Sequence, residues 1–335
     1  MEYLPVLEVG DKSLDRRPER RDLGRLSETP HSELLWTFIQ LLTYILTPPG
    51  APKRQQLPAS IERRCKPNHL PTEEPLRYHR TFGLDIEQLD ALEKCIEEIL
   101  PEPWNKGTGR PKSLSLREAI MVALLYKRQN ITEEVIADLF GISQSVVSGI
   151  IKDFDPLITQ ATEEFVPDAE EAKEMTRGRL ALVDGTLWPC WSWKIAPELW
   201  AGKYKTTGYG SLIISDEFGN IIFVSDPAPG CDHDMKKLEG TVKAILDLAG
   251  SVIADKGFQG SGYVTPAKKP KDRDLYMREH EYNNQISSIR APIERAVAHL
   301  KTWKTLFTDY RRPLGTYLDS WRAAIGLYFF KLSFK

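Results

Sequence analysis

Three acidic residues stand where carboxylates could gather around metal ions. Asp184 ends a predicted apolar strand, Asp255 follows the apolar residues 252–254 in the same way, and Glu294 lies in a later helical segment. Two strand-end aspartates and a helical glutamate can converge on two divalent ions, roughly 3.5–4 Å apart, that activate the attacking oxygen and stabilise the leaving oxygen in phosphoryl transfer. A carboxylate set without clustered Cys or His suits Mg²⁺ or Mn²⁺. The sequence therefore predicts a two-metal site.

A fourth acid, Asp234, ends the loop 227–234 and opens a predicted helix. An aspartate at such a position is commonly a helix N-cap, which is the alternative to a metal ligand. Its neighbour His233 could orient a metal-bound water, although a structural hydrogen bond is the favoured interpretation.

The segments that position these acids predict a mixed α/β domain over residues 176–335. Strands are expected at 180–188, 209–216, 221–226 and 251–254, and helices at 235–248 and 287–305. The turn residues 217–220 between two of the strands predict a hairpin. A hairpin, a helix, another strand and further helices are typical of a mixed sheet with flanking helices.

Residues 132–154 have the pattern of a helix-turn-helix motif. Thr132 is an expected N-cap, Ala137 is small where two helices cross, Gly141 suits the turn, and Ser143 is expected to cap the second helix. Apolar residues fall where the motif needs a core, namely Ile136, Phe140, Ile142, Val147 and Ile150. The N-terminal end of the second helix would then present Gln144, Ser145 and Ser148 to base edges in the major groove. The alternative is an ordinary helical hairpin in a bundle.

Composition places these elements in a globular protein of two or more domains. The chain has 335 residues, of which 41% are hydrophobic and 27% charged, with a net charge of −2. Such a charge does not by itself indicate a nucleic-acid partner. No apolar run reaches the roughly 18 residues of a membrane-spanning helix, so no membrane is expected. Four widely separated cysteines favour a reducing cytosol over a disulfide framework.

Three regions follow from these patterns. Residues 1–75 are expected to be a tail with one short helix and a linker, and residues 76–160 an all-α domain that contains the helix-turn-helix. The third region is the α/β domain of residues 176–335. Tryptophans follow Asp184 and are interleaved with basic residues, namely Trp188, Trp191, Trp193, Trp200, Lys194, Lys203 and Lys205. These aromatics could stack on unpaired bases, but packing against the sheet is the favoured interpretation.

Four motifs resemble the nuclease domain of IS5-type and Harbinger-type transposases, in the order in which that family has them. They are Asp-Gly-Thr at 184–186, Pro-Gly-x-x-His-Asp at 229–234, Asp-Lys-Gly-Phe at 255–258, and Arg290-x3-Glu294-x6-Lys301. The resemblance covers residues 78–312, including the helix-turn-helix.

The resemblance implies an RNase H-like fold with Asp184, Asp255 and Glu294 as the acidic triad. Asp234 would be a further metal ligand, and whether it or Asp255 is the second member of the triad stays open, although the strand-end position favours Asp255. Arg290 and Lys301 would contact DNA phosphates near the scissile bond.

The activity that the resemblance implies is DNA transposition. The helix-turn-helix would hold terminal inverted repeats, and two Mg²⁺ (or Mn²⁺) ions at the acids would support strand cleavage and then strand transfer into target DNA. Work on two DNA ends predicts a homodimer or larger assembly, in the bacterial cytoplasm with the nucleoid or in a eukaryotic nucleus. The alternatives are a domesticated, catalytically silent protein that binds DNA or a partner, and a nuclease of the same fold that only hydrolyses.

Overall fold

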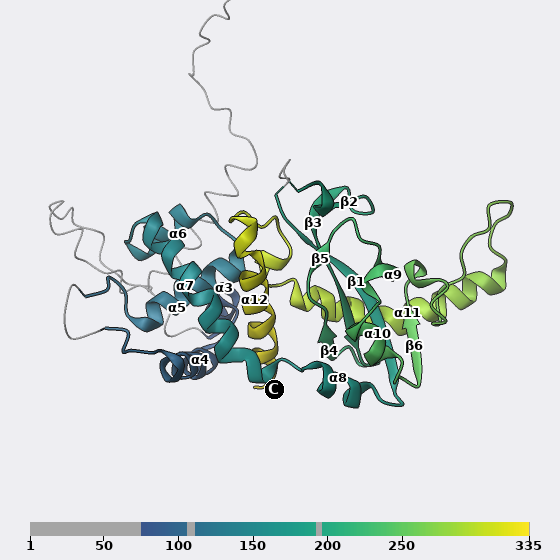
Figure 1. Cartoon of the computed structure of the whole chain (residues 1–335), viewed down its shortest axis with the longest axis horizontal. Coiled ribbons are helices and arrows are strands. Elements are labelled where there is room, and N and C mark those ends of the chain that lie inside the picture. Colours follow the sequence, from purple (N-terminus) through teal and green to yellow (C-terminus); the bar gives the residue numbers. More distant parts are fainter. Residues whose placement is uncertain (1–74, 106–110, 192–195, 335) are drawn as a thin grey trace, which may run out of the picture.

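The computed structural model describes residues 75–105, 111–191 and 196–334 of the chain. The tail predicted for residues 1–75, with its short helix, lies outside the described residues except for Pro75, as do Trp193 and Lys194. Figure 1 shows a helical half beside a half built on a curled sheet, with α12 (Tyr317–Leu332) between them.

The helical half is built from helices whose ends follow local rules. They are α3 (Pro75–Phe82), α4 (Ile86–Ile99), α5 (Leu116–Gln129), α6 (Glu133–Phe140) and α7 (Gln144–Thr162). The Ser115 hydroxyl and the Glu118 carboxylate cap the start of α5 reciprocally, and Asn130 ends it in the left-handed conformation at φ 47°. All residues from Ala119 to Lys127 are buried, so α5 is the central helix of this half.

The helix-turn-helix geometry is present in α6 and α7. Gly141 ends α6 at φ 64°, a left-handed conformation that suits glycine. Ile136 and Phe140 on α6 and Val147 and Ile150 on α7 are buried as the pattern predicts. The expected capping bonds are absent, because neither Thr132 nor Ser143 accepts a backbone N–H at its helix end. The Ser143 hydroxyl lies instead 2.9 Å from that of Ser145.

The second half contains a six-stranded mixed sheet. Its strands are β1 (Leu180–Pro189), β2 (Trp200–Ala201), β3 (Thr206–Ser215), β4 (Ile221–Val224), β5 (Ala228–Pro229) and β6 (Ser251–Ala254). The order is β2-β3-β1-β6, with β4 and β5 also paired to β3. β1 is antiparallel to β3 and parallel to β6. The predicted hairpin at 217–220 joins β3 to β4, with Gly219 at φ 92° in its turn.

Helices cover both faces of this sheet. Alternate strand residues pack in opposite directions: Leu182 and Ile253 share a core with Ile293 of α11 (Met277–Leu300), whereas Val183 and Leu212 pack with residues of α10 (Thr241–Leu246). The remaining helices are α8 (Ala169–Thr176) and α9 (Asp234–Lys237). The predicted fold class, a mixed sheet with flanking helices plus an all-α helix-turn-helix region, is confirmed.

Two helix predictions were wrong in their bounds. The helix expected at 235–248 is two short helices, because Gly240 between them adopts φ 65° and interrupts the α-helical path. The helix expected at 287–305 begins at Met277, where the Glu279 carboxylate accepts the backbone N–H of Tyr276, and ends at Leu300. The segment after it forms a short 3₁₀ turn at Lys304–Leu306.

The last helix joins the helical half. α12 lies mainly against α7, and Phe330 belongs to the same buried cluster as Phe154 and Ile158 of α7. That cluster also continues to the α11 side of the sheet. One hydrophobic core thus runs through both halves and does not mark a division between them. The domain boundaries at 160 and 176 stay a prediction.

Within the described residues, no single helix has the length and apolar composition to cross a membrane. One bent pair, Glu133–Phe140 with Gln144–Thr176, meets that test by length and composition. It contains the helix-turn-helix helices, whose apolar faces are buried.

Candidate active site

The three acids of the predicted triad face one guanidinium group. Nη2 of Arg290 lies 3.1 Å from Oδ1 of Asp184, and its Nη1 lies 3.7 Å from Oδ1 of Asp255 and 3.5 Å from Oε1 of Glu294. Arg290 itself is only 7% exposed. Residues separated by up to 110 positions in the chain thus surround one guanidinium group.

The strands and α11 explain this convergence. The parallel register of β1 and β6 ends at the pair Val183 and Ala254, so Asp184 and Asp255 are the next residue on each strand. Arg290 and Glu294 are one turn apart on α11, which contacts both strands. The prediction that Asp184 ends its strand was wrong, since β1 continues to Pro189 and beyond Val183 pairs only with β3.

Asp234 lies beside the same group. A Cβ placed on Gly185 would lie 2.7 Å from Oδ1 of Asp234, and one on Gly257 would lie 3.6 Å from its Oδ2. Those glycines are next to Asp184 and two residues beyond Asp255, so the Asp234 carboxylate approaches both strand ends. The N-cap alternative was wrong: Asp234 is the first residue of α9, and His233 occupies the N-cap position without a side-chain capping bond.

The glycine at 185 gives a direct test of the position of Asp234. Gly185→Ala would put a methyl group 2.7–2.9 Å from the Asp234 carboxylate atoms, and a displacement of about 1 Å in an active site can cost up to about 100-fold. We expect DNA cleavage to fall roughly 10–100-fold with an unchanged melting temperature. Gly202→Ala is the control, because its added methyl meets no atom within 4 Å. If Gly185→Ala and Gly202→Ala had equal activity, Asp234 would not be part of the active site.

Lysines complete the charge pattern around the acids. Nζ of Lys203 lies 3.7 Å from Oδ2 of Asp234, and Nζ of Lys237 lies 3.5 Å from its Oδ1. Burial acts to lower the pKa of Lys203, but Tyr204, Asp234 and Asp255 outweigh it and leave that pKa raised. Lys203 was expected only among residues interleaved with tryptophans, and Lys237 was not predicted. Lys237 is three residues from Asp234 on α9, a spacing that brings side chains together on a helix, whereas the approach of Lys203 depends on the tertiary fold.

Burial also affects the groups nearest Asp184. It raises the pKa of Asp184, with Asp255 adding to the rise and Arg290 opposing it. Lys301 is half-buried, with Nζ 5.8 Å from the ring of Trp188, and burial lowers its pKa against the attraction of Asp184. The site is therefore a partly desolvated cluster in which each carboxylate has a cation nearby.

The donor set suits hard divalent cations. All four acids offer carboxylate oxygens, which Mg²⁺ and Mn²⁺ prefer. In the part of the chain that the structure describes, no three Asp, Glu, His or Cys side chains close on one point as a metal cluster. The Arg290 guanidinium lies between Asp184, Asp255 and Glu294 and carries the positive charge that balances them. The carboxylate oxygens therefore suit the predicted ions, and the Arg290 guanidinium lies between the side chains that would hold them.

The predicted DNA-contacting residues lie in different surroundings. Gln144 and Ser145 are exposed at the start of α7, and the Gln144 amide donates to the Glu133 carboxylate. Ser148 is half-buried and accepts hydrogen bonds from Arg312 at its hydroxyl (3.4 Å) and its carbonyl (3.2 Å). Arg290 faces the acids and Lys301 faces Trp188. Their contacts with DNA stay a prediction.

The tryptophans divide between core and surface. Trp188 is fully buried and its Nε1 donates to the Ser211 hydroxyl at 2.8 Å, so packing is its role. Trp191 and Trp200 are about half exposed, at 52% and 50%.

Comparison with known proteins gives the family. Residues 183–327 match the family described as DDE superfamily endonuclease, and residues 112–163 match the helix-turn-helix of DDE superfamily endonuclease. A putative transposase for insertion sequence element IS112 from Streptomyces albus G is 30% identical over 59% of this chain and 73% of its own length. A probable transposase for insertion sequence element IS702 from Microchaete diplosiphon is 25% identical over 77% of this chain and 95% of its own. No solved structure matches the chain. The acids that converge on α11 and the helices of residues 112–163 fall inside these matches, and the chain belongs to the DDE superfamily endonucleases that carry a helix-turn-helix domain.

Proposed function

We propose that the protein is a transposase that cuts DNA at the ends of a mobile element and joins the freed ends to target DNA. The observation that carries this proposal is that Asp184, Asp255 and Glu294 surround the Arg290 guanidinium beside Asp234. The two relatives described as insertion-sequence transposases support it. The motif spacing also favours an IS5-type or Harbinger-type element.

The four acids would hold two Mg²⁺ or Mn²⁺ ions. When bound, such ions activate the attacking oxygen and stabilise the leaving oxygen of the phosphodiester. Asp184, on the strand that pairs with both β3 and β6, and Asp255 would supply donors from the sheet, and Glu294 would add a donor from α11. Lys203 and Lys301 flank the acids and would attract the non-bridging oxygens of the scissile phosphate.

Binding of specific DNA would fall to the start of α7. Gln144 and Ser145 are exposed there, and both side chains can bond base edges in a major groove. Ser148 would contribute less, because Arg312 engages it. Since both ends of an element must be processed, we infer a homodimer or larger assembly on double-stranded DNA, located with the chromosome in the cytoplasm of a bacterium.

Arg290 would keep the acids in place before metal binds. Arg290→Gln removes the cation that Asp184, Asp255 and Glu294 share, so their repulsion is expected to lower the free energy of unfolding by about 1–3 kcal/mol in EDTA. Millimolar Mn²⁺ should restore part of that loss. Urea unfolding with and without Mn²⁺ measures both effects, and Arg278→Gln, an exposed arginine in the first turn of the same helix, is the control. An unchanged stability in EDTA would contradict this role.

A two-product assay tests the proposed function. Purified protein is incubated with Mg²⁺, a duplex that carries the element's terminal repeat, and a target plasmid. Nicked repeat DNA together with repeat joined to plasmid is the expected result. Nicking without joining would indicate a purely hydrolytic nuclease, and intact DNA with no thermal stabilisation by Mn²⁺ would indicate a silent DNA-binding relative.

A further inference from the structure

A basic pocket lies at the junction of the two halves, on the side of α11 away from the acids. Its volume is about 400 Å³, and it is bounded by the β3–β4 turn, α11, α12 and the ends of α3 and α5. With 3.6 residues per turn, Arg295 and His299 lie about 140–180° around α11 from Arg290. The pocket is therefore separate from the active site although it shares a helix with it.

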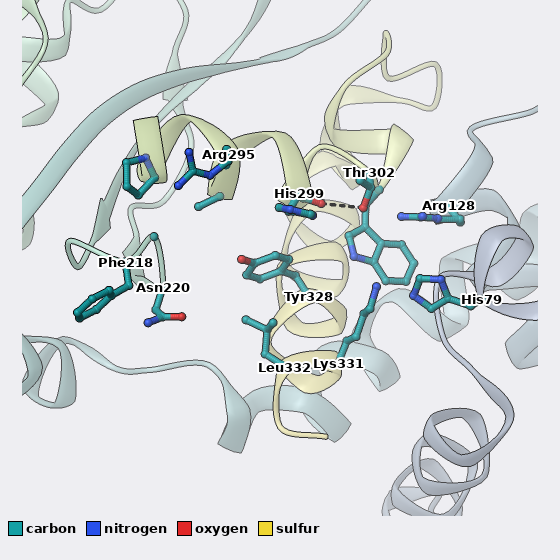
Figure 2. Close-up of a pocket in the computed structure, with 14 residues that line it drawn as sticks. His79, Arg128, Phe218, Asn220, Arg295, His299, Thr302, Tyr328, Lys331 and Leu332 are labelled. Atoms are coloured by element: carbon teal, nitrogen blue, oxygen red, sulfur yellow. Dashed lines mark hydrogen bonds between the residues drawn. The ribbon is translucent and has the colours of Figure 1, made fainter. Parts of the chain in front are cut away.

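The side chains that line the pocket are strongly cationic. Its basic members are His79, Arg128, Arg295, His299 and Lys331, and none of its lining residues is an aspartate or a glutamate. Figure 2 shows Arg128, His79 and Lys331 at one end of the pocket and Arg295 and His299 along the α11 side. The chain as a whole has a net charge of −2, so a pocket lined by two arginines and a lysine without a carboxylate is a local concentration of positive charge.

The unpaired guanidinium of Arg128 indicates that the pocket binds an anion. Its Nη1 is buried and has no hydrogen-bond partner, and no carboxylate of the described residues forms an ion pair with it. Burial alone lowers the pKa of Arg128, and no acid opposes it. A guanidinium stays protonated in proteins, so a half-buried and unpaired charge is costly until an anion meets it. Its one described partner is the ring of Trp303, 5.7 Å away.

The β3–β4 turn carries two acids, Asp216 and Glu217, and neither lines the pocket. The Asp216 carboxylate accepts the backbone N–H groups of Phe218 (3.0 Å) and Asn220 (2.8 Å) and the Asn220 amide (2.7 Å). It is committed to the turn. The surroundings of His79 also lack enough negative charge to balance the cations. Burial lowers the pKa of His79, and the nearby Lys331 and Arg128 lower it further.

We propose that this pocket binds a phosphate group, and that the phosphate is a backbone phosphodiester of duplex DNA. The assignment of the phosphate to DNA rests on the proposed function. Arginine donors in a fixed fork suit phosphate oxygens, and the Asn220 amide, which gives one N–H to Asp216, has a second to donate at the rim. Because the pocket joins residues of α3 and α5 to residues of α11, a bound phosphate would hold the helical half and the nuclease half in one register on the DNA.

The test compares Arg128→Gln and Arg295→Gln with Arg177→Gln in the full-length protein. Each change removes one positive charge, but Arg177 is exposed and paired with Glu174 on α8. Fluorescence anisotropy with duplex DNA over a range of salt concentrations is the first readout. Loss of one phosphate contact should weaken binding roughly tenfold and reduce the slope of log Kd against log salt by about 0.9. The second readout is thermal stabilisation by inorganic phosphate over chloride at equal ionic strength.

Weaker DNA binding with a smaller slope in both pocket variants, and not in the control, supports the DNA phosphodiester. Loss of stabilisation by inorganic phosphate with unchanged DNA binding supports the phosphate site and assigns it to a small free phosphate compound instead. Wild-type behaviour in both readouts overturns the proposal. If Arg128→Gln fails to fold, the exposed Arg295→Gln still decides between these outcomes. The two proposals can also fail separately. If wild-type protein neither cuts nor joins DNA but the pocket variants still bind DNA or phosphate more weakly, the transposase proposal is wrong and the phosphate site is retained.

Discussion

Asp184→Asn is expected to reduce metal-dependent DNA cleavage by on the order of 10³-fold while leaving the fold and DNA affinity intact. Metal ions stabilise phosphoryl-transfer charge by several kcal/mol, and each 1.36 kcal/mol is about a tenfold change in rate. Asp184 is the acid closest to Arg290 and lies on the central strand pair of the sheet. An amide keeps the shape of the carboxylate but is a poorer ligand for a hard cation.

The matched control is Asp226→Asn. Asp226 also follows a strand of the same sheet, but it is 78% exposed and its nearest cation is Arg322 at 3.9 Å, outside the acid cluster. Cleavage of element-end DNA with Mg²⁺, followed over time on a gel, compares the two variants with wild type. Retention of full activity by Asp184→Asn would place the metal site elsewhere. Equal loss in Asp226→Asn would show that the assay reports folding and not chemistry.

Asp155→Asn is expected to cost about 3–5 kcal/mol of the free energy of unfolding, the usual penalty for removing one partner of a buried ion pair. Nζ of Lys127 lies 2.6 Å from Oδ1 of Asp155, and the two side chains are 0% and 4% exposed. Burial lowers the pKa of Lys127, and Asp155 opposes that effect. Without the carboxylate, the lysine would be a charge inside the core with the Ser320 hydroxyl as its remaining partner.

Urea unfolding of three proteins checks this expectation. Replacing both partners, Lys127→Met with Asp155→Leu, should recover most of the loss, because a nonpolar pair of similar volume fills the same space. Asp247→Ala is the control, since its pair with Lys243 is on the surface and such pairs contribute little. A loss below about 1 kcal/mol for Asp155→Asn would mean that water reaches Lys127 or that the pair is not formed.

The local patterns were predictable where each depends on neighbours in sequence. The turn at Gly141 and the β3–β4 hairpin follow from short-range rules and were confirmed. The gathering of Asp184 and Asp255 followed from their positions after apolar strands, even though β1 continues past Asp184. The ends of the helices were less predictable. The apolar spacing continues on both sides of Gly240, but this glycine interrupts the helix.

Other features depend on contacts between distant segments and had no sequence signal. The contact of Arg290 with all three acids needs the crossing of α11 over β1 and β6, and a basic residue at that spacing is equally suited to DNA. The approach of Lys203 to Asp234 and the contact of Arg312 with Ser148 arise in the same way. Buried charges are rare, so sequence rules place them on the surface.

The position of α12 has a consequence for synthesis of the protein. Lys127 on α5 bonds to Ser320 on α12, and α12 lies mainly against α7, so the core around the helix-turn-helix contains residues made nearly 200 positions apart. A nascent chain still on the ribosome would have α6 and α7 translated long before the helix that packs against them. Burial of the apolar face of α7 therefore waits until α12 has been made. A product terminated before Tyr317 would contain α6, α7 and all four acids but would lack this packing.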